Sequence, residues 1–280
     1  MTDFEKLIRF NESNIKGKEH FNLPDADFRN ASLAGFDLNL ADLRGADFSH
    51  ADLQNANLER ANLQGANFEG ANLSGATLQY AYLYASNLKG TNLTNANLTG
   101  AKLTGVNLSL AILQGCDFSR AFLTYAYCRN NQVCNANFTN ADLTRADFSG
   151  CNLSNSNFHA AKLNFAKLSN VIINDTNFSE AELEYTDLKD AQSTFSDFSK
   201  AYLKRTDLSN AQLSGSVFEN AGMVHTRLYD TNLTFGNLTG VDLMGAHLYN
   251  TRLFGADLTG TRIDDYMDDY FDIEYLKNLH

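Results

Sequence analysis

The sequence of 280 residues predicts an all-β solenoid, a parallel β-helix whose coils have four sides of five residues each. The first observation is a five-residue phrase, which stands twice in residues 41–50 as ADLRG and ADFSH. The phrase is a small residue, then Asp or Asn, then Leu or Phe, then two mostly polar residues. The second observation is the constancy of its phase, and the third is a 20-residue spacing of phenylalanines. A fixed short period of this kind indicates a repeat array.

The Leu or Phe position, which we call the centre, recurs every five residues from Leu23 to Ile263 without a change of phase. Six centres depart from Leu or Phe, and only one of the six is polar. They are Cys128, Val133, Ile173, Ser193, Met223 and Ile263. The array is therefore expected to cover residues 21–265, between an N-terminal segment over 1–20 and a C-terminal tail over 266–280.

A period of five predicts the shape of the coil. A helix returns side chains to one side about every 3.6 residues and a strand every two residues, so neither fits. A coil with four nearly equal sides brings every fifth side chain to the interior. The centres then fill the axis, and the residue two positions earlier also points inward, where only a small side chain fits. The other three positions face water, and stacked coils would lie roughly 4.8 Å apart.

The phenylalanines test the length of a coil. One set is spaced by 20 residues and comprises Phe118, Phe138, Phe158, Phe178, Phe198 and Phe218. A second set, Phe28, Phe48 and Phe68, has the same spacing but is offset by half a coil. Ring stacking between neighbouring coils would stabilise both columns. The sequence thus predicts 20 residues per coil, about 12 coils and an array roughly 60 Å long.

The N-terminal segment predicts a short helix over about residues 3–10. Thr2 followed by Glu5 has the pattern of a capping box. Phe4, Leu7 and Ile8 then share one helical face. We expect this helix to cover the first coil, because an open β edge invites association.

Residues 126–135, AYCRNNQVCN, fit the phrase least well, and Asn131 occupies a position meant for a small residue. Two interpretations are open. The ten residues could leave the coil as a loop, which would bring most phenylalanines into one column, or they could stay in register with weak centres. A distinguishing activity is expected where the phrase fails. The candidate protein contacts in this stretch are Arg129, Asn130, Asn131 and Gln132.

A milder irregularity lies at residues 192–195, where Ser193 is the centre and Phe195 could turn inward instead. The sequence predicts a local bulge there.

The tail over 266–280 predicts a second helix. Met267, Phe271 and Tyr275 are four residues apart, and Asp264 or Asp265 could cap the N-terminus. The tail could cover the last coil or form a homodimer contact, because it carries more aromatic surface than a lid needs. Its candidate protein contacts are Tyr266, Met267, Tyr270 and Phe271.

Composition disfavours several classes of protein. A formal net charge of -11 is unsuited to direct binding of nucleic acid. No run of about 18 apolar residues predicts a membrane span, and the N-terminus lacks the basic and then apolar order of a signal peptide. The four cysteines have no CxxC spacing, so we interpret them as reduced thiols in a cytoplasmic protein.

No pattern in the sequence predicts catalysis. The six histidines lie at outward positions or near the ends, without metal-ligand spacing. Carboxylates mostly occupy the Asp or Asn position, where stabilisation of a turn explains both residue types. A coil filled with side chains leaves no substrate pocket. We therefore expect no enzyme activity, no cofactor or metal site and no small-molecule substrate.

The run of Ala-Asp/Asn-Leu-x-x from about residue 26 to 260 resembles the pentapeptide-repeat family, as in ADL at 51–53 and ANLQGANF at 61–68. The resemblance implies a right-handed quadrilateral β-helix. The opening LIRF at 7–10 and FNL at 21–23 are similar to the lead-in of cyanobacterial members. Most members have no assigned activity. One branch consists of dimeric rods that resemble DNA, bind gyrase and protect it from quinolones or toxins, although their repeats are less regular than these.

The functional expectation is a non-catalytic scaffold whose polar sides bind another protein of unknown identity, with mimicry of DNA towards gyrase as the alternative. Residues 70–174 carry a net charge of +4, whereas 25–69, 175–230 and 231–280 each carry −5. A duplex mimic along the whole length should not contain this basic interval. Two rods meeting at their C-terminal halves could still continue an acidic surface through a dimer.

Overall fold

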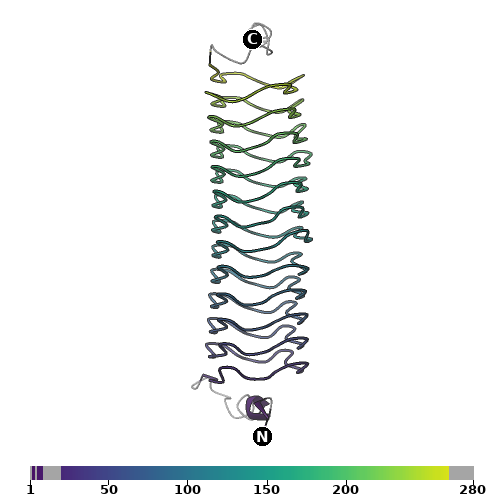
Figure 1. Cartoon of the computed structure of the whole chain (residues 1–280), viewed down its shortest axis with the longest axis vertical. Helices are drawn as coiled ribbons and strands as arrows, with labels where there is room; N and C mark the ends of the chain where they lie inside the picture. Colours follow the sequence, from purple (N-terminus) through teal and green to yellow (C-terminus); the bar gives the residue numbers. More distant parts are fainter. Residues whose placement is uncertain (1, 4, 9–19, 265–280) are drawn as a thin grey trace. The chain divides into compact units, whose positions relative to one another are not determined.

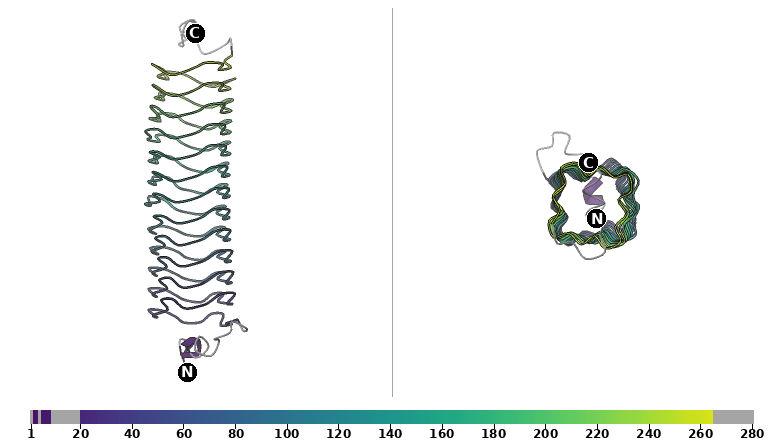
Figure 2. Two further views of the ribbon diagram at one scale, coloured as in Figure 1. Left: turned by 180° about the vertical axis from the view of Figure 1, so that it is seen from behind. Right: turned by 90° about the horizontal axis from the view of Figure 1, so that it is seen from above.

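The computed structural model describes residues 2–3, 5–8 and 20–264. The chain divides into two compact units, Met1–Asp142 and Leu143–His280, each of which is described by itself. Residues 3 and 5–8 are helical, and the described part of the array has neither helices nor extended strands. Instead each five-residue side contributes a single β-bridge residue followed by a turn. Within each unit these sides stack coil upon coil (Figure 1), and the coils have a four-sided outline (Figure 2).

Every β-bridge in the described residues is parallel and joins one residue to the residue 20 further on. In the first unit the bridges run from the Asn22–Asp42 pair to the Phe122–Asp142 pair. In the second unit they run from Asp147–Lys167 to Asp242–Arg262. The predicted coil of 20 residues with four sides is thereby confirmed within each unit.

The backbone explains why the phrase has this composition. In residues 46–50, the N–H of Ala46 closes a turn by donating to Leu43 O at 3.1 Å. The N–H of Asp47 donates to the previous coil, and the N–H groups of Phe48 and His50 donate to the next coil, at distances of 2.7–2.9 Å. Four of the five N–H groups therefore have backbone acceptors, as buried or ordered amides require.

The fifth N–H group is satisfied by the Asp or Asn side chain of the phrase. Ser49 N–H donates to Asp47 Oδ1 at 2.9 Å, and Ser179 N–H donates to Asn177 Oδ1 at 2.8 Å. Asp and Asn side chains characteristically accept a bond from the N–H two residues on. The role in turns that the sequence predicted for these side chains is confirmed, and no catalytic explanation of them is needed.

The last residue of each phrase has a positive φ. The non-glycine residues in this conformation all occupy that position, and asparagine is frequent among them, as at Asn30 and Asn55. Asparagine tolerates the left-handed region better than other side chains. Bulky residues also occur there, including Leu110, Phe195 and Phe235, whose side chains are strongly exposed. These exceptions place apolar surface on the corners of the coils.

The interior consists of centres and small residues, as expected. In the first unit the ring of Phe48 stacks between those of Phe28 and Phe68, with centroid distances of 5.1 and 4.9 Å. In the second unit Phe158, Phe178, Phe198 and Phe218 form a continuous stack with distances of 4.9–5.0 Å. All these rings are buried. The predicted phenylalanine columns therefore exist within each unit.

Residues 126–135 stay in the coil, so the loop interpretation is wrong. Tyr127 bridges to Asn107 and Gln132 bridges to Ile112, with the usual spacing of 20. Asn131 is tolerated because its Nδ2 donates to Leu108 O at 2.6 Å. Threonine at the small position donates to the equivalent carbonyl, 23 residues earlier, as when Thr206 Oγ1 donates to Leu183 O. A hydrogen bond to the preceding coil therefore lets a polar side chain occupy this buried position.

The bulge predicted at Ser193 is also wrong. Gln192 bridges to both Ile172 and Gln212, so the ladder continues without an extra residue. Ser193 remains inward, and its Oγ lies 2.5 Å from Ser196 Oγ and also accepts the Ser196 N–H. Phe195 does not turn in, because its side chain is 69% exposed. Side-chain hydrogen bonds replace the missing apolar centre.

The capping box at the N-terminus is confirmed. Thr2 N–H donates to Glu5 Oε2 at 2.8 Å, and Glu5 N–H donates to Thr2 Oγ1 at 3.1 Å. Leu7 is fully buried, and the Asp27 N–H of the first coil donates to Asp3 Oδ2 at 3.3 Å. The helical residues thus contact the first coil. The C-terminal end of the predicted helix and the tail over 266–280 lie outside the described residues.

Candidate functional site

The sequence-predicted contact residues divide into three groups. Arg129, Asn130 and Gln132 are exposed, and the Arg129 guanidinium lies 5.3 Å from the centroid of the Tyr127 ring. Asn131 is buried, so its side chain supplies no contact surface and that prediction was wrong. The four tail residues, Tyr266, Met267, Tyr270 and Phe271, lie outside the described residues.

The cysteines are explained by packing. Cys116, Cys128 and Cys151 are buried, and no disulfide joins the four cysteines. Burial raises the pKa of the Cys116 thiol to about 12, which makes it a poor nucleophile at neutral pH. Within the described ranges, no group of three or more His, Cys, Asp or Glu residues could hold a metal ion. Nor does that part of the chain contain a helix long and apolar enough to cross a membrane.

One side of the first unit carries an aromatic patch, which we define as Tyr80, Tyr82, Tyr84, Lys102, Phe122 and Tyr125. Tyr82, Lys102 and Phe122 occupy the same bridge position in three successive coils. The Lys102 Nζ lies 3.2 Å from the centroid of the Phe122 ring, and the Tyr82 and Tyr84 rings are 6.5 Å apart. The aromatic members of the patch are exposed. The patch therefore presents aromatic rings and a cation together to solvent.

Sequence reasoning missed this patch, although a signal was present. Tyr82 and Phe122 stand where the phrase has Asp or Asn, and they are 40 residues apart, which places them two coils apart on one side. The sequence-based predictions concerned departures from the phrase at inward positions, whereas Tyr82 and Phe122 depart from it at an outward position. Aromatic substitution at outward positions spaced by multiples of 20 is the pattern that would have found it.

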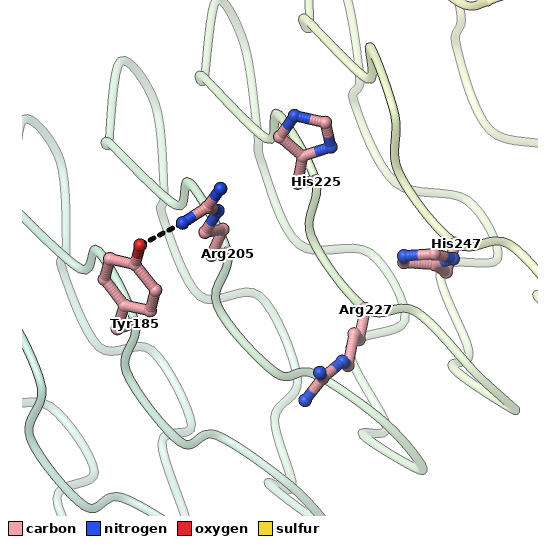
Figure 3. Close-up of a pocket in the computed structure, with 5 residues that line it drawn as sticks. All are labelled: Tyr185, Arg205, His225, Arg227 and His247. Atoms are coloured by element: carbon pink, nitrogen blue, oxygen red, sulfur yellow. Dashed lines mark hydrogen bonds between the residues drawn. The ribbon is translucent and has the colours of Figure 1, made fainter.

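The second unit contains a groove of about 420 Å³, which we call the basic groove (Figure 3). Its lining residues are Tyr185, Arg205, His225, Arg227 and His247. Tyr185, Arg205 and His225 occupy the positive-φ corner position of three successive coils. Arg227 and His247 come from the adjacent side, where they form a bridge pair. The spacing of 20 residues between coils thus gathers five polar side chains from two columns.

The corner column holds Arg205 in place. The Phe165 and Tyr185 rings are stacked, with centroids 5.0 Å apart and an interplanar angle of 6°. The Arg205 guanidinium lies over the Tyr185 ring at 5.3 Å and donates a hydrogen bond to the Tyr185 hydroxyl. Figure 3 shows this pair, with His225 on the next coil of the same column. Stacking and a hydrogen bond together orient the guanidinium.

Asp207 holds the other arginine. Its Oδ2 lies 3.4 Å from Arg227 Nη1 and 3.3 Å from Lys189 Nζ. Burial opposes ionisation of this carboxyl, but hydrogen bonds from Ser209 and Lys189 outweigh that effect and lower its pKa. Asp207 therefore stays ionised at neutral pH beside Arg227 and orients its guanidinium.

We predict that Asp207→Asn lowers the free energy of unfolding by about 1 kcal/mol at pH 7, because a charged hydrogen-bond acceptor is lost. A carboxyl whose pKa falls on folding stabilises the fold above its unfolded pKa, and this contribution disappears as the pH falls. The difference between the two proteins should therefore vanish as the pH is lowered from about 4 towards 2. Urea unfolding at several pH values measures it, and a difference that persists unchanged in acid would contradict this role for the charge.

Two profiles of known protein families match the repeats of this chain. The profile described as "Pentapeptide repeats" matches residues 22–60, 51–90, 91–126 and 230–260. The profile described as "Pentapeptide repeat region" matches residues 141–218. Together the two profiles match well over half of the chain. Among curated proteins, none matches significantly.

Several solved structures are similar. HetL, a pentapeptide repeat protein involved in heterocyst differentiation regulation in the cyanobacterium Nostoc sp. Strain PCC 7120, is 24% identical, with 97% of this chain and 99% of that chain covered and a TM-score of 0.25. Rfr23 from the cyanobacterium Cyanothece 51142 is 24% identical over 49% of this chain and 91% of its own, with a TM-score of 0.22. QnrB1, a plasmid-mediated fluoroquinolone resistance protein, is 17% identical over 92% and 99%, with a TM-score of 0.27.

At these TM-scores, the similarity to the solved structures does not indicate a function. The matched profiles and the 20-residue parallel ladder agree on the repeat and its register. The chain belongs to the pentapeptide repeat family.

Proposed function

We propose that this protein is a non-catalytic scaffold that binds another protein through the aromatic patch of its first unit. The observation that carries the proposal is the column Tyr82, Lys102 and Phe122, in which two exposed aromatic rings flank a cation on three successive coils. Aromatic side chains are enriched at the centres of protein interfaces, where they contribute a large share of the binding energy.

The backbone beneath the patch is regular, and such a support suits a surface that binds another protein. Apart from Tyr84, which is a turn residue, the aromatic members stand at bridge or corner positions. The backbone beside Tyr82 is held by bonds to neighbouring coils, because the N–H groups of Tyr82 and Leu83 donate to Ala61 O and Lys102 O. A patch on such a support loses little conformational entropy when it binds. The nearby ring of Tyr80 contributes further surface beside Arg60, whose guanidinium lies 5.9 Å from the ring centroid.

Ion pairing favours the scaffold over a mimic of DNA. Several carboxylates are paired with a cation in the next coil, including Glu69 with Lys89, Glu180 with Lys200 and Glu184 with Lys204. Asp27 and Asp42 pair instead with Arg29 and Arg44 of the same coil. A duplex mimic presents unpaired negative charges at regular intervals, whereas these pairs reduce the field of the acidic side chains.

The test is capture of a partner by the full chain and by matched variants. The double variant Tyr82→Ser/Phe122→Ser removes the two aromatic rings that flank Lys102 in the patch. The control variant Ile172→Ser/Tyr202→Ser removes two comparably exposed side chains from the second unit. The wild-type chain is first used to capture a partner protein from a lysate of the encoding organism, and the partner is then purified. We expect the purified partner to bind the Tyr82→Ser/Phe122→Ser variant at least tenfold more weakly than the wild type, as for loss of interface hot spots. The control variant should bind like the wild type. Equal binding by all three proteins, or no captured protein, would refute the proposal.

A further inference from the structure

The basic groove of the second unit has many hydrogen-bond donors without acceptors in the described part of the chain. A guanidinium carries five N–H donors. Arg205 donates to the Tyr185 hydroxyl, and Arg227 donates to Asp207 at 3.4 Å. Beyond these bonds, neither guanidinium has a side-chain acceptor among the described residues. Most of their donor capacity is therefore available to a ligand.

The two histidines of the groove add to this capacity. Among the described residues, the His225 ring forms no hydrogen bond, and the His247 ring has only a tilted contact with Tyr229, with centroids 5.7 Å apart. Figure 3 shows the two rings on the coils that follow those of Arg205 and Arg227. Each imidazole can donate a hydrogen bond in its neutral form and two in its charged form.

Two acidic groups next to lining residues are already engaged. Asp207 is buried and interacts with both Lys189 and Arg227. Glu184 pairs with Lys204 at 3.3 Å. No carboxylate is among the five lining residues. The groove thus offers a positive site in a stretch of sequence, 175–230, whose net charge is negative.

The arginines are also held before a ligand arrives. Arg205 is stacked on Tyr185, which is itself stacked on Phe165, and Arg227 is oriented by Asp207. Ordering a long side chain on binding costs free energy, and prior orientation removes part of this cost. A planar guanidinium that is already oriented suits the bidentate recognition of anionic oxygens.

We propose that the basic groove binds a phosphoryl group, as a phosphate monoester or as free phosphate. Two arginines can each direct paired N–H donors at a tetrahedral dianion, and the imidazoles and the tyrosine hydroxyl can satisfy its remaining oxygens. A carboxylate has only two oxygens and one charge, so it would use a smaller part of this donor set. The volume of 420 Å³ exceeds that of a phosphate ion and leaves room for a group that carries it.

The experiment uses the histidine rings of the full-length protein as reporters. Ring resonances are followed by NMR at constant pH and ionic strength while inorganic phosphate, a phosphoserine peptide or its unphosphorylated counterpart is added. We expect saturable shifts of His225 and His247 with the two phosphorylated probes, and none of His50 or His159, which lie outside the groove. Tighter binding of the phosphopeptide would identify a phosphorylated chain as the source of the group, and equal or tighter binding of phosphate would identify a small ligand.

Two independent variants test the arginines. Arg205→Gln and Arg227→Gln should each weaken binding about tenfold or more, because each removes a charged donor from the site. Arg29→Gln, which removes an exposed, ion-paired arginine of the first unit, should leave binding unchanged. Circular dichroism verifies that all three variants fold. Shifts that do not saturate, that include His159 equally, or that persist unchanged in both groove variants would overturn the proposal.

Discussion

Replacement of Phe198 by alanine is expected to lower the free energy of unfolding by about 3–5 kcal/mol. The Phe198 ring is fully buried and stacks on Phe178 and Phe218, with centroids 5.0 and 4.9 Å away and interplanar angles of 6° and 3°. Its removal takes away a buried aromatic side chain and two ring contacts at once. The neighbouring coils are joined by backbone hydrogen bonds, so they cannot collapse freely into the space.

Urea unfolding followed by circular dichroism measures the loss, and Phe195→Ala is the matched control. Phe195 lies three residues away in the same coil but is 69% exposed, so its truncation should change stability by no more than about 0.5 kcal/mol. In a solenoid, stability depends on each coil and its nearest neighbours. Amide hydrogen exchange should therefore accelerate first near residues 178–218 in the Phe198 variant. Similar unfolding midpoints for the two variants would contradict the structural role assigned to the phenylalanine stack.

Replacement of Asn131 by threonine is expected to stabilise the protein by about 1–2 kcal/mol, because a buried acceptor without a partner is removed. Asn131 Nδ2 donates to Leu108 O, but its Oδ1 is buried without a hydrogen-bond partner among the described residues. Threonine has nearly the same volume. At Thr206, Thr226 and Thr231 it donates from the same position to the carbonyl 23 residues earlier.

The thermal midpoint and the urea midpoint of Asn131→Thr should both rise relative to the wild type. Thr226→Asn provides the reverse experiment, because it places the asparagine amide in a small-residue position that threonine now satisfies. That variant should be destabilised by a similar amount. A loss of stability in Asn131→Thr would show instead that the asparagine amide is required in this coil.

Much of the fold could be predicted because the inward positions obey strong physical limits. A centre must fill the axis and the residue two before it must be small, so Phe48 and Ala46 specify their positions by volume alone. The Asp or Asn residue follows from the one N–H group per side that lacks a backbone acceptor, as the bond from Ser49 to Asp47 shows. Thr2 and Glu5 likewise specify the capping box by local chemistry.

The wrong predictions concern positions where the local sequence allows the chain either to stay in the coil or to leave it. Asn131 and Ser193 resembled defects from which a loop or a bulge should follow, yet both stay in the coil. Their polar atoms reach acceptors 20 or 23 residues earlier, Leu108 O for Asn131 and Ile173 O for Ser193. The composition of a single five-residue side cannot predict these hydrogen bonds, because the accepting carbonyl belongs to the preceding coil.

The period, the length of the coil and the identity of the buried residues follow from the amino-acid sequence, because each of these depends on side-chain volume at a fixed spacing. Which outward residues meet depends instead on how the coils stack. Stacking at a spacing of 20 brings Tyr82 and Phe122 to one side of the first unit, and it gathers Arg205, His225 and Arg227 around one groove of the second. Outward positions carry no packing constraint, so their significance depends on neighbours that lie a full coil away.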